Sequence, residues 1–179
     1  LARSGNFEKA QEIYYDKLFG AVIENFKLKH SSKLPKGGIL FSILGFSPEP
    51  IILTARTIEP DTHIIFTTNN QSEGNDYLVR YLESNYEMVY LSDENFNTMY
   101  KALKEQLVLN PSSQITLDIT GGKKSMVASA AIFGKDYGCK IVYVDFEEYI
   151  KDLRKPMPGS EILNIVYNPF ENQPEIFLK

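Results

Sequence analysis

Along most of the chain, short runs of consecutive apolar residues alternate with longer stretches in which apolar positions recur at helical spacing. Consecutive apolar runs predict strands that are buried on both faces, and recurrence every three or four residues predicts amphipathic helices. We expect five strands, at 39–44, 63–67, 87–91, 114–119 and 140–144, and four helices between them, at 49–58, 75–84, 94–108 and 123–137. This alternation predicts right-handed β–α–β units and a parallel sheet with helices on both sides.

The two ends of the chain depart from this alternation. An amphipathic helix is predicted over 7–26, and a polar, lysine-rich linker with Pro35 follows over 27–38. The helix either packs on the domain or serves as a connector or a dimer-forming stalk. After a polar turn around 155–159, a last strand at 161–167 is expected to return antiparallel to the fifth.

The predicted fold class is α/β, a Rossmann-like doubly wound and mostly parallel sheet with a C-terminal antiparallel strand, preceded by the N-terminal amphipathic helix. We divide the chain into an N-terminal helix and linker, 1–36, and an α/β domain, 37–179.

Charge and composition narrow the classes of function. The 179 residues contain 19 Lys and Arg against 23 Asp and Glu, a net charge of −4, so the surface as a whole does not attract long nucleic acids. The single cysteine, Cys139, excludes an internal disulfide and suits a reducing cytoplasm, and two histidines make a metal centre an unfavoured hypothesis. We therefore expect no metal and no cofactor. No apolar run is long enough to span a bilayer, and no signal peptide is visible.

In an open parallel sheet, ligands bind beyond the carboxyl ends of the strands, where the strand order reverses. The first and fourth strands should border that crevice. The segment 45–50 after the first strand reads Gly-Phe-Ser-Pro-Glu-Pro, in which glycine permits a sharp turn and proline suits the first helical turn. Ser47 is predicted to be the helix N-cap, and its hydroxyl either only caps the helix or also contacts a ligand phosphate or ribose.

The segment after the fourth strand, 118–126, opens directly into a helix. Gly121 and Gly122 would let the backbone approach a ligand closely, and a helix N-terminus attracts anions. Lys123 and Lys124 are cations at the end of the helix where cations are unfavourable, which favours an anion bound there. Asp118 is interpreted as a structural hydrogen-bonding residue and not as a catalytic one.

Common nucleotide and hydrolase motifs are absent from the sequence. G-x-G-x-x-G does not occur, and Gly122-Lys123-Lys124-Ser125 lacks the first glycine of a P-loop and carries an extra lysine. No serine stands in a nucleophile elbow. An ordinary NAD site, a P-loop NTPase and a serine hydrolase are thereby disfavoured.

The two loops together resemble the CARF domain, the CRISPR-associated Rossmann fold of type III CRISPR ancillary proteins. Its Leu-Gly-x-Ser-Pro turn after the first strand is matched by 44–48, and its Asp-x-Thr-Gly-Gly-Thr-Lys-x-Met segment by 118–126. Lys123 stands where the family has threonine. The resemblance covers about residues 38–167 and leaves the N-terminal helix unexplained.

The resemblance implies a two-fold dimer that binds cyclic oligoadenylate, most often cyclic tetra-adenylate, across the dimer axis. Lys124 would pair with phosphate, supported by Lys123, while Ser47 and Thr120 would supply hydroxyl contacts. Adenine edges would meet the polar segment 69–71, unless that segment is only a strand-to-helix loop. The ligand-binding residues implied in this way are Gly45, Phe46, Ser47, Thr68, Asn69, Asn70, Thr120, Gly121, Gly122, Lys123, Lys124 and Met126.

Two functions remain open. The first is a sensor module that controls an effector in antiviral defence, and the second is a metal-independent ring nuclease in which a ribose 2′-OH attacks the adjacent phosphate. In the second, Lys124 would stabilise the developing charge and Ser47 would orient the ring. No general base is evident near either loop, so we favour the binding module over an enzyme and assign no catalytic residue. A mononucleotide-binding Rossmann protein outside CRISPR is a third alternative.

The effector is expected upstream, because little sequence follows the last strand and the chain opens at Leu1 instead of a methionine. Lys27, Lys29 and Lys33 would suit a cytoplasmic membrane surface. A membrane effector would make this a cytoplasmic domain anchored to the inner membrane, as a homodimer or a higher oligomer. Soluble effectors are the alternative.

Overall fold

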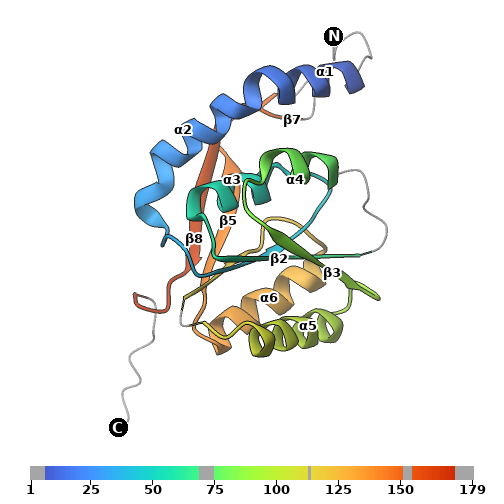
Figure 1. Ribbon diagram of the computed structural model, residues 1–179, viewed down its shortest axis with the longest axis vertical. Coiled ribbons are helices and arrows are strands. Elements are labelled where there is room, and N and C mark those ends of the chain that lie inside the picture. The colour runs from blue at the N-terminus through green and yellow to red at the C-terminus, as the bar shows by residue number, and fades with distance from the viewer. Residues whose placement is uncertain (1–6, 69–74, 113, 151–154, 172–179) are drawn as a thin grey trace.

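The computed structural model describes residues 7–68, 75–112, 114–150 and 155–171, which form one six-stranded sheet between two layers of helices (Figure 1). The strand order is β3-β2-β1-β4-β5-β8. Neighbours among the first five strands pair in parallel, and β8 pairs antiparallel with β5, so the predicted doubly wound, mostly parallel sheet is confirmed. The strands are β1 (Ile39–Ile43), β2 (Thr62–Thr68), β3 (Tyr86–Leu91), β4 (Ile115–Asp118), β5 (Lys140–Phe146) and β8 (Glu161–Tyr167).

Helices cover the sheet on both faces, as the alternating pattern predicts. On one face lie α3 (Glu49–Ile58) and α4 (Asn75–Tyr81), and on the other α5 (Phe96–Leu109) and α6 (Lys124–Asp136) lie side by side (Figure 1). The bounds of α3 are as predicted. The α4 helix ends three residues early, before a Ser-Asn pair that favours a turn over a helix.

The N-terminal helical segment is longer than predicted. It consists of α1 (Phe7–Tyr14), a π-helical turn η2 (Tyr15–Phe19) and α2 (Gly20–His30), followed by the 3₁₀ turn η3 (Ser31–Lys33). The prediction of a linker from residue 27 is therefore wrong for its first turn. Helix continues to His30 because that side chain is buried and no proline occurs before Pro35.

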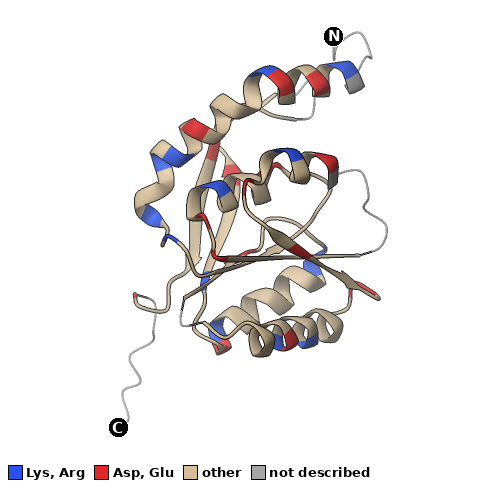
Figure 2. Ribbon diagram, viewed as in Figure 1, with Lys and Arg blue, Asp and Glu red and all other residues tan. Residues whose placement is uncertain are grey.

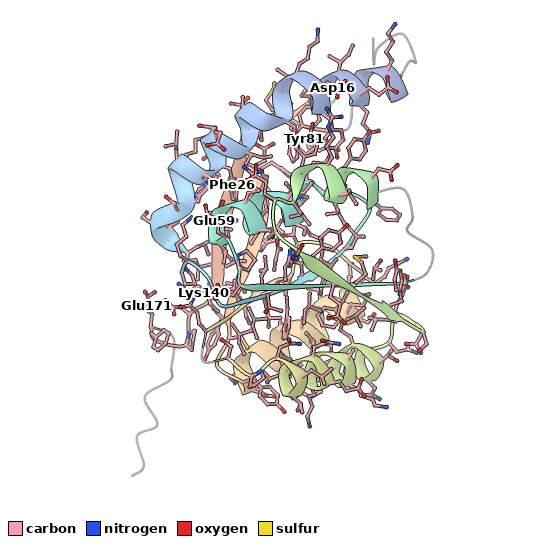
Figure 3. All side chains as sticks on the ribbon, in the orientation of Figure 1. Asp16, Phe26, Glu59, Tyr81, Lys140 and Glu171 are labelled. Atoms are coloured by element: carbon pink, nitrogen blue, oxygen red, sulfur yellow. The ribbon has the colours of Figure 1, made fainter. Side chains whose placement is uncertain are left out.

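This segment packs into the core as an outer layer on α3 and α4, and its inner side chains fill the space between them (Figures 1 and 3). The side chains buried in this way are Tyr15, Phe19, Val22, Ile23 and Phe26, each at most 6% exposed. The packed arrangement, and not a protruding stalk, is the one observed within this chain.

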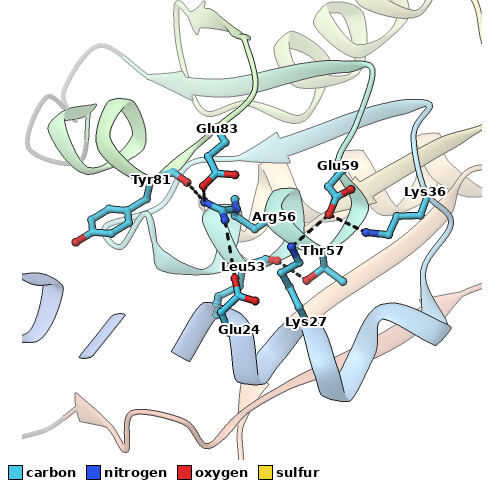
Figure 4. Close-up of polar contacts among 9 residues, drawn as sticks. All are labelled: Glu24, Lys27, Lys36, Leu53, Arg56, Thr57, Glu59, Tyr81 and Glu83. Carbon is cyan, nitrogen blue, oxygen red and sulfur yellow. Dashed lines mark hydrogen bonds and ion pairs between the residues drawn. The ribbon is translucent and has the colours of Figure 1, made fainter. Parts of the chain in front are cut away.

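Arg56 of α3 joins the N-terminal segment to the connection between α4 and β3 (Figure 4). Its guanidinium is 2.6 Å from the Glu83 carboxylate and 3.9 Å from that of Glu24, and it donates a hydrogen bond to the Tyr81 carbonyl. The Arg56 side chain is only 17% exposed, so these contacts are better shielded from solvent than an ordinary surface ion pair.

A second polar contact lies at the C-terminal end of α3, where Glu59 ends the helix in the left-handed conformation. Its carboxylate is 3.3 Å from the Lys27 ammonium and 2.9 Å from that of Lys36 (Figure 4). Hydrogen bonds from these two lysines lower the pKa of Glu59. The helix end is thereby linked both to α2 and to the segment that leads into β1.

The segment predicted as a polar turn around 155–159 includes a short hairpin that the sequence pattern did not reveal. Strands β6 (Tyr149–Ile150) and β7 (Lys155–Pro156) pair antiparallel before the chain turns at Gly159, whose φ is +89°. The Gly159 carbonyl accepts hydrogen bonds from Asn25 and Lys29 of α2. The connection to β8 is therefore fastened to the N-terminal helix.

Charged side chains lie mainly on the outer surfaces of the helices, and the centre of the sheet is largely uncharged (Figure 2). Within the part of the chain that the structure describes, no helix has the length and apolar character needed to cross a membrane.

Candidate functional site

The candidate site lies where β1 and β4 end side by side, at the point where the strand order reverses. The loop after β1 is held at both ends. The Leu44 N–H donates to the Phe66 carbonyl over 2.9 Å, and the Pro48 carbonyl accepts the first helical hydrogen bond from Ile52 over 3.1 Å. Only residues 45–47 are left to form the exposed part of this loop.

The two loops pack directly on one another through glycines. A Cβ atom on Gly121 would overlap the Ile43 carbonyl oxygen and approach the Gly45 nitrogen to 2.5 Å. Gly122 has φ +86°, and a Cβ there would overlap the Ile43 side chain. Glycine is therefore required at both positions by packing within the chain, because the two loops approach each other, and the predicted close approach to a ligand stays a prediction.

Asp118 fixes the second loop. Its Oδ1 accepts hydrogen bonds from the Thr120 N–H over 3.0 Å and from the Thr120 hydroxyl over 2.5 Å, and that hydroxyl accepts one from the Val144 N–H over 2.8 Å. Burial raises the pKa of Asp118, and the bonds from Thr120 oppose the rise. The carboxyl is 1% exposed and has the structural role predicted for it. Because the Thr120 hydroxyl proton is donated to Asp118, Thr120 cannot donate it to a ligand phosphate while this bond persists.

Two helices begin at this site, and the N-cap of α3 differs from the predicted one. The prediction that Ser47 caps α3 is wrong: the N-cap is Pro48, and the structure shows no side-chain cap there. Because the Pro48 carbonyl accepts the first helical bond, Pro48 and not Ser47 occupies the cap position, and Ser47 stays exposed in the loop. On the other side, Lys123 is the N-cap of α6 with extended backbone, φ −77° and ψ 156°.

Between the loops is a cavity of about 310 Å³. Residues of both loops, the ends of β2 and β5 and the start of α5 form its wall. They are Leu44, Gly45, Phe46, Ser47, Pro50, Thr68, Glu94, Thr120, Gly121, Gly122, Lys123, Met126, Tyr143, Val144 and Phe146. Most of the residues predicted from the two loops are therefore gathered at one cavity.

Of the predicted residues that the structure describes, one is not part of this wall. Lys124 is exposed in the first turn of α6, but it does not line the cavity. Asn69 and Asn70, with the neighbouring Gln71, lie outside the described residues.

The cavity wall also contains residues that the sequence analysis missed. Tyr143 and Phe146 come from β5, which the predicted strand order already places beside β4, so its end could have been included. Glu94 gave no such signal, because it lies in the connection from β3 to α5, and β3 is an edge strand that is not adjacent to β1 or β4. Its carboxylate is 3.7 Å from the Lys123 ammonium, and its carbonyl accepts a hydrogen bond from the Ser125 hydroxyl.

The side chains of His63 and Cys139, which could also do chemistry, lie inside the core. His63 of β2 is 1% exposed, with Nε2 3.0 Å from the Ser42 hydroxyl, and burial lowers its pKa to about 3. Burial raises the pKa of the Cys139 thiol to about 12, so the thiol is inert at neutral pH. Among the described residues, no group of three histidine, cysteine or acidic side chains could hold a metal ion.

Comparison with known proteins gives one sequence relative and several structural ones. No family model matches the chain. The CRISPR system endoribonuclease Csm6 of Thermus thermophilus is 33% identical over 93 residues, which are 49% of this chain and 20% of Csm6. The chain therefore corresponds to about a fifth of that protein.

Two solved structures share the fold at low sequence identity. Can2 from Sulfobacillus thermosulfidooxidans, solved in complex with cyclic tetra-adenylate, gives a TM-score of 0.51 at 19% identity, over 60% of this chain and 32% of that one. Protein VC1899 from Vibrio cholerae gives a TM-score of 0.51 at 14% identity, over 60% of this chain and 30% of that one. The sequence match to Csm6 and the fold shared with Can2 agree with the two loop motifs and support a CARF domain in this chain.

Proposed function

We propose that this CARF domain is a sensor of cyclic oligoadenylate in type III CRISPR defence, and that cyclic tetra-adenylate is its ligand. The observation that carries the proposal is the cavity itself, which gathers both motif-bearing loops at the switch point of the sheet. The sequence relative is a CRISPR system endoribonuclease, and the structural relative Can2 binds cyclic tetra-adenylate.

Different residues of the cleft can contact different parts of the ligand. The N-terminus of α6, with Lys123 beside it, suits a phosphate, because the first N–H groups of a helix lack intrahelical partners and carry positive partial charge. Ser47 can donate its hydroxyl from the opposite loop. Lys124, in the first turn of α6, could reach a phosphate outside the cavity. The apolar part of the wall suits a base or a ribose.

The size of the cavity favours a dimer. Its volume of about 310 Å³ is at the small end of the range for ligand pockets, about 300–1,000 Å³. A ring of four nucleotides is larger than such a pocket holds, so a second copy would enclose the rest. A two-fold axis through the ring lets both copies present the same residues.

Calorimetry and sedimentation with the purified chain test the proposal. We expect one cyclic tetra-adenylate per two chains, weaker binding of cyclic hexa-adenylate, and no binding of linear tetra-adenylate or AMP at the same concentration. Absence of binding to every cyclic oligoadenylate would contradict the sensor function, and tighter binding of the larger ring would change only the ligand.

A ring nuclease is the second candidate, and Glu94 is the observation that favours it. This carboxylate lies in the cavity wall beside Lys123, where the sequence showed no general base. In that reaction Glu94 takes the proton of a ribose 2′-OH, whose oxygen attacks the adjacent phosphorus. The bond to the 5′-oxygen breaks and this oxygen takes a proton from water, leaving a 2′,3′-cyclic phosphate and a 5′-hydroxyl. If the wild type converts the labelled ring to linear products and Glu94→Gln does not, the nuclease activity is established. If the ring stays intact after prolonged incubation, the nuclease is excluded and the sensor function is the one that remains.

We also propose that the domain works in the cytoplasm and controls an effector. Two of the three lysines that suggested a membrane surface make intramolecular contacts, Lys27 with Glu59 and Lys29 with the Gly159 carbonyl. These contacts give the two lysines a role within the chain, so the lysines do not distinguish a membrane effector from a soluble one. Fractionating cells that express the full gene product distinguishes them, because a membrane effector sediments with the membranes and a soluble one does not.

A further inference from the structure

Phe46 is the most exposed large apolar side chain among the described residues, at 92%. The backbone of its loop is nevertheless held in place on both sides of Phe46. Gly45 before it packs on Gly121, and Pro48 after it is buried and begins α3. The loop therefore holds an aromatic ring in solvent at the edge of the candidate cavity, an arrangement that burial within this chain does not explain.

The wall of the cavity contains further aromatic surface. Phe146, at the end of β5, is 36% exposed, and Tyr143 of the same strand is partly buried. These rings come from β5, whereas Phe46 comes from the loop after β1, so aromatic groups enter the cavity wall from two separate elements. Flat apolar surfaces of this kind bind nucleobases by stacking on them.

The charge of the wall also points to contacts with the bases. Glu94 and Lys123 are its charged residues within the described part of the chain, and they lie 3.7 Å apart. Their charges cancel at any distance large compared with that separation. The charged side chains of the wall therefore add little long-range attraction for a polyanionic ring, which favours a contribution of the bases to the affinity.

We propose that Phe46 binds an adenine base of the ring by stacking, and that it is a main determinant of affinity at this site. The inference rests on the proposed function and assigns the role of one residue within it. Stacking recognises the face of a base and not its edge, so Phe46 would contribute to affinity for any purine ring and would not by itself select adenine.

The test compares Phe46→Ala with Phe170→Ala, a control whose ring is 90% exposed elsewhere on the surface. Phe46→Tyr retains the aromatic face, and Phe46→Leu retains apolar area without it. The probe is a cyclic tetranucleotide in which 2-aminopurine replaces one adenine, because the fluorescence of this base is quenched when it stacks on a ring.

We expect Phe46→Ala to weaken binding about 5- to 150-fold, the range for loss of one base–aromatic stack, and to reduce the quenching. Phe46→Tyr should bind within about threefold of the wild type. Phe46→Leu should lose most of the affinity, and Phe170→Ala should lose none. Circular dichroism and sedimentation accompany each measurement.

Normal affinity and quenching in Phe46→Ala would overturn the proposal. So would a loss of affinity that disappears at high protein concentration and follows a loss of dimer, because Phe46 would then contact a second copy and not the ligand. If the wild type binds no cyclic oligoadenylate, the proposed function fails instead, so the two failures are distinguishable.

Discussion

On the face of the sheet that α5 and α6 cover, the central row is Ile64, Phe41, Leu117 and Ile141, all apolar and at most 2% exposed. On the opposite face, beneath α3 and the N-terminal segment, the next row is Ile65, Ser42, Asp118 and Val142. His63 and Thr116 are also on this second face. One face is a conventional apolar core, and the other has buried polar groups at its centre.

The buried polar groups of the second face are linked to the candidate cleft. The polar row ends at the candidate cleft, where Asp118 fixes Thr120 and through it the second loop. Buried polar groups contribute less than apolar ones to the core, and the N-terminal helix adds Phe19 and Phe26 on that same face. We infer that the polar face fixes the second loop through Asp118, whereas the apolar face supports the site by packing, through Ile43 against Gly122 and through Met126 in the cavity wall.

The largest effect is expected from removing one aromatic ring on each face. Phe26→Ala and Phe133→Ala, at residues 1% and 0% exposed, should each lower the free energy of unfolding by about 3–5 kcal/mol, because each leaves a cavity in a packed core. Leu28→Ala, at an 84% exposed position of the same helix as Phe26, should change it by no more than about 0.5 kcal/mol.

Denaturant titration followed by fluorescence and circular dichroism measures all three variants. A loss below about 1 kcal/mol in Phe26→Ala, with the full loss in Phe133→Ala, would show that the N-terminal helix is dispensable to the core.

Disrupting the glycine contact between the loops should lower the free energy of unfolding less than removing a core aromatic ring does. Gly121→Ala places a methyl group against the backbone of Ile43 and Gly45, and overpacking of this kind lowers stability by about 1–3 kcal/mol. Gly20→Ala is the matched control: its backbone is helical, no atom lies within 4 Å of the added Cβ, and stability should rise by about 0.5–1 kcal/mol. Equal melting temperatures for the two variants would contradict the packing described between the loops.

The polar face should also make stability depend on pH. His63 has a pKa of about 3 when folded and about 6.5 when unfolded, so the unfolded chain binds more protons between these values and stability falls as the pH falls. From pH 7 to pH 5 its contribution to the loss should be about 2 kcal/mol.

Burial raises the pKa of Glu161, which acts in the opposite sense, so the wild-type curve alone is not diagnostic. The difference between the wild type and His63→Gln isolates the histidine, and a difference that does not vary from pH 7 to pH 5 would exclude this role.

The smallest effect concerns the ion pair in the cleft. Glu94→Gln should release Lys123 for a ligand phosphate and raise the affinity for cyclic tetra-adenylate about two- to fivefold, as expected for a half-exposed pair worth at most about 1 kcal/mol. Glu105→Gln, which removes an exposed ion pair with Lys101 on α5, should not change the affinity. Weaker binding in Glu94→Gln would show instead that this carboxylate contacts the ligand.

The sheet could be predicted because its strands are consecutive apolar runs, a signal that each strand carries within itself. The cleft could be placed because topology puts the ends of β1 and β4 together. Contacts between elements were not predictable in this way: Glu94 meets Lys123 only after β3 and α6 have taken their places. Likewise His30 remains helical because of tertiary burial, which local composition does not show.

The prediction for Ser47 failed for a local reason. Serine followed by proline fits an N-cap and a first helical residue, and it fits equally well one residue before the cap. The hydrogen bond from Ile52 to Pro48 decides between the two, and it depends on how α3 docks on the sheet.

The π-helical turn at Tyr15–Phe19 determines how α1 is rotated about the helix axis relative to α2. One residue advances an α-helix by about 100°, and a π turn accommodates about one residue more than an α turn does. Because the turn absorbs this extra residue, deleting one residue there would leave α1 in its present orientation, whereas forcing the same sequence into a regular α-helix would rotate α1 by about 100° around its own axis. For a domain fused upstream, this short turn would decide which of its sides faces the rest of the chain.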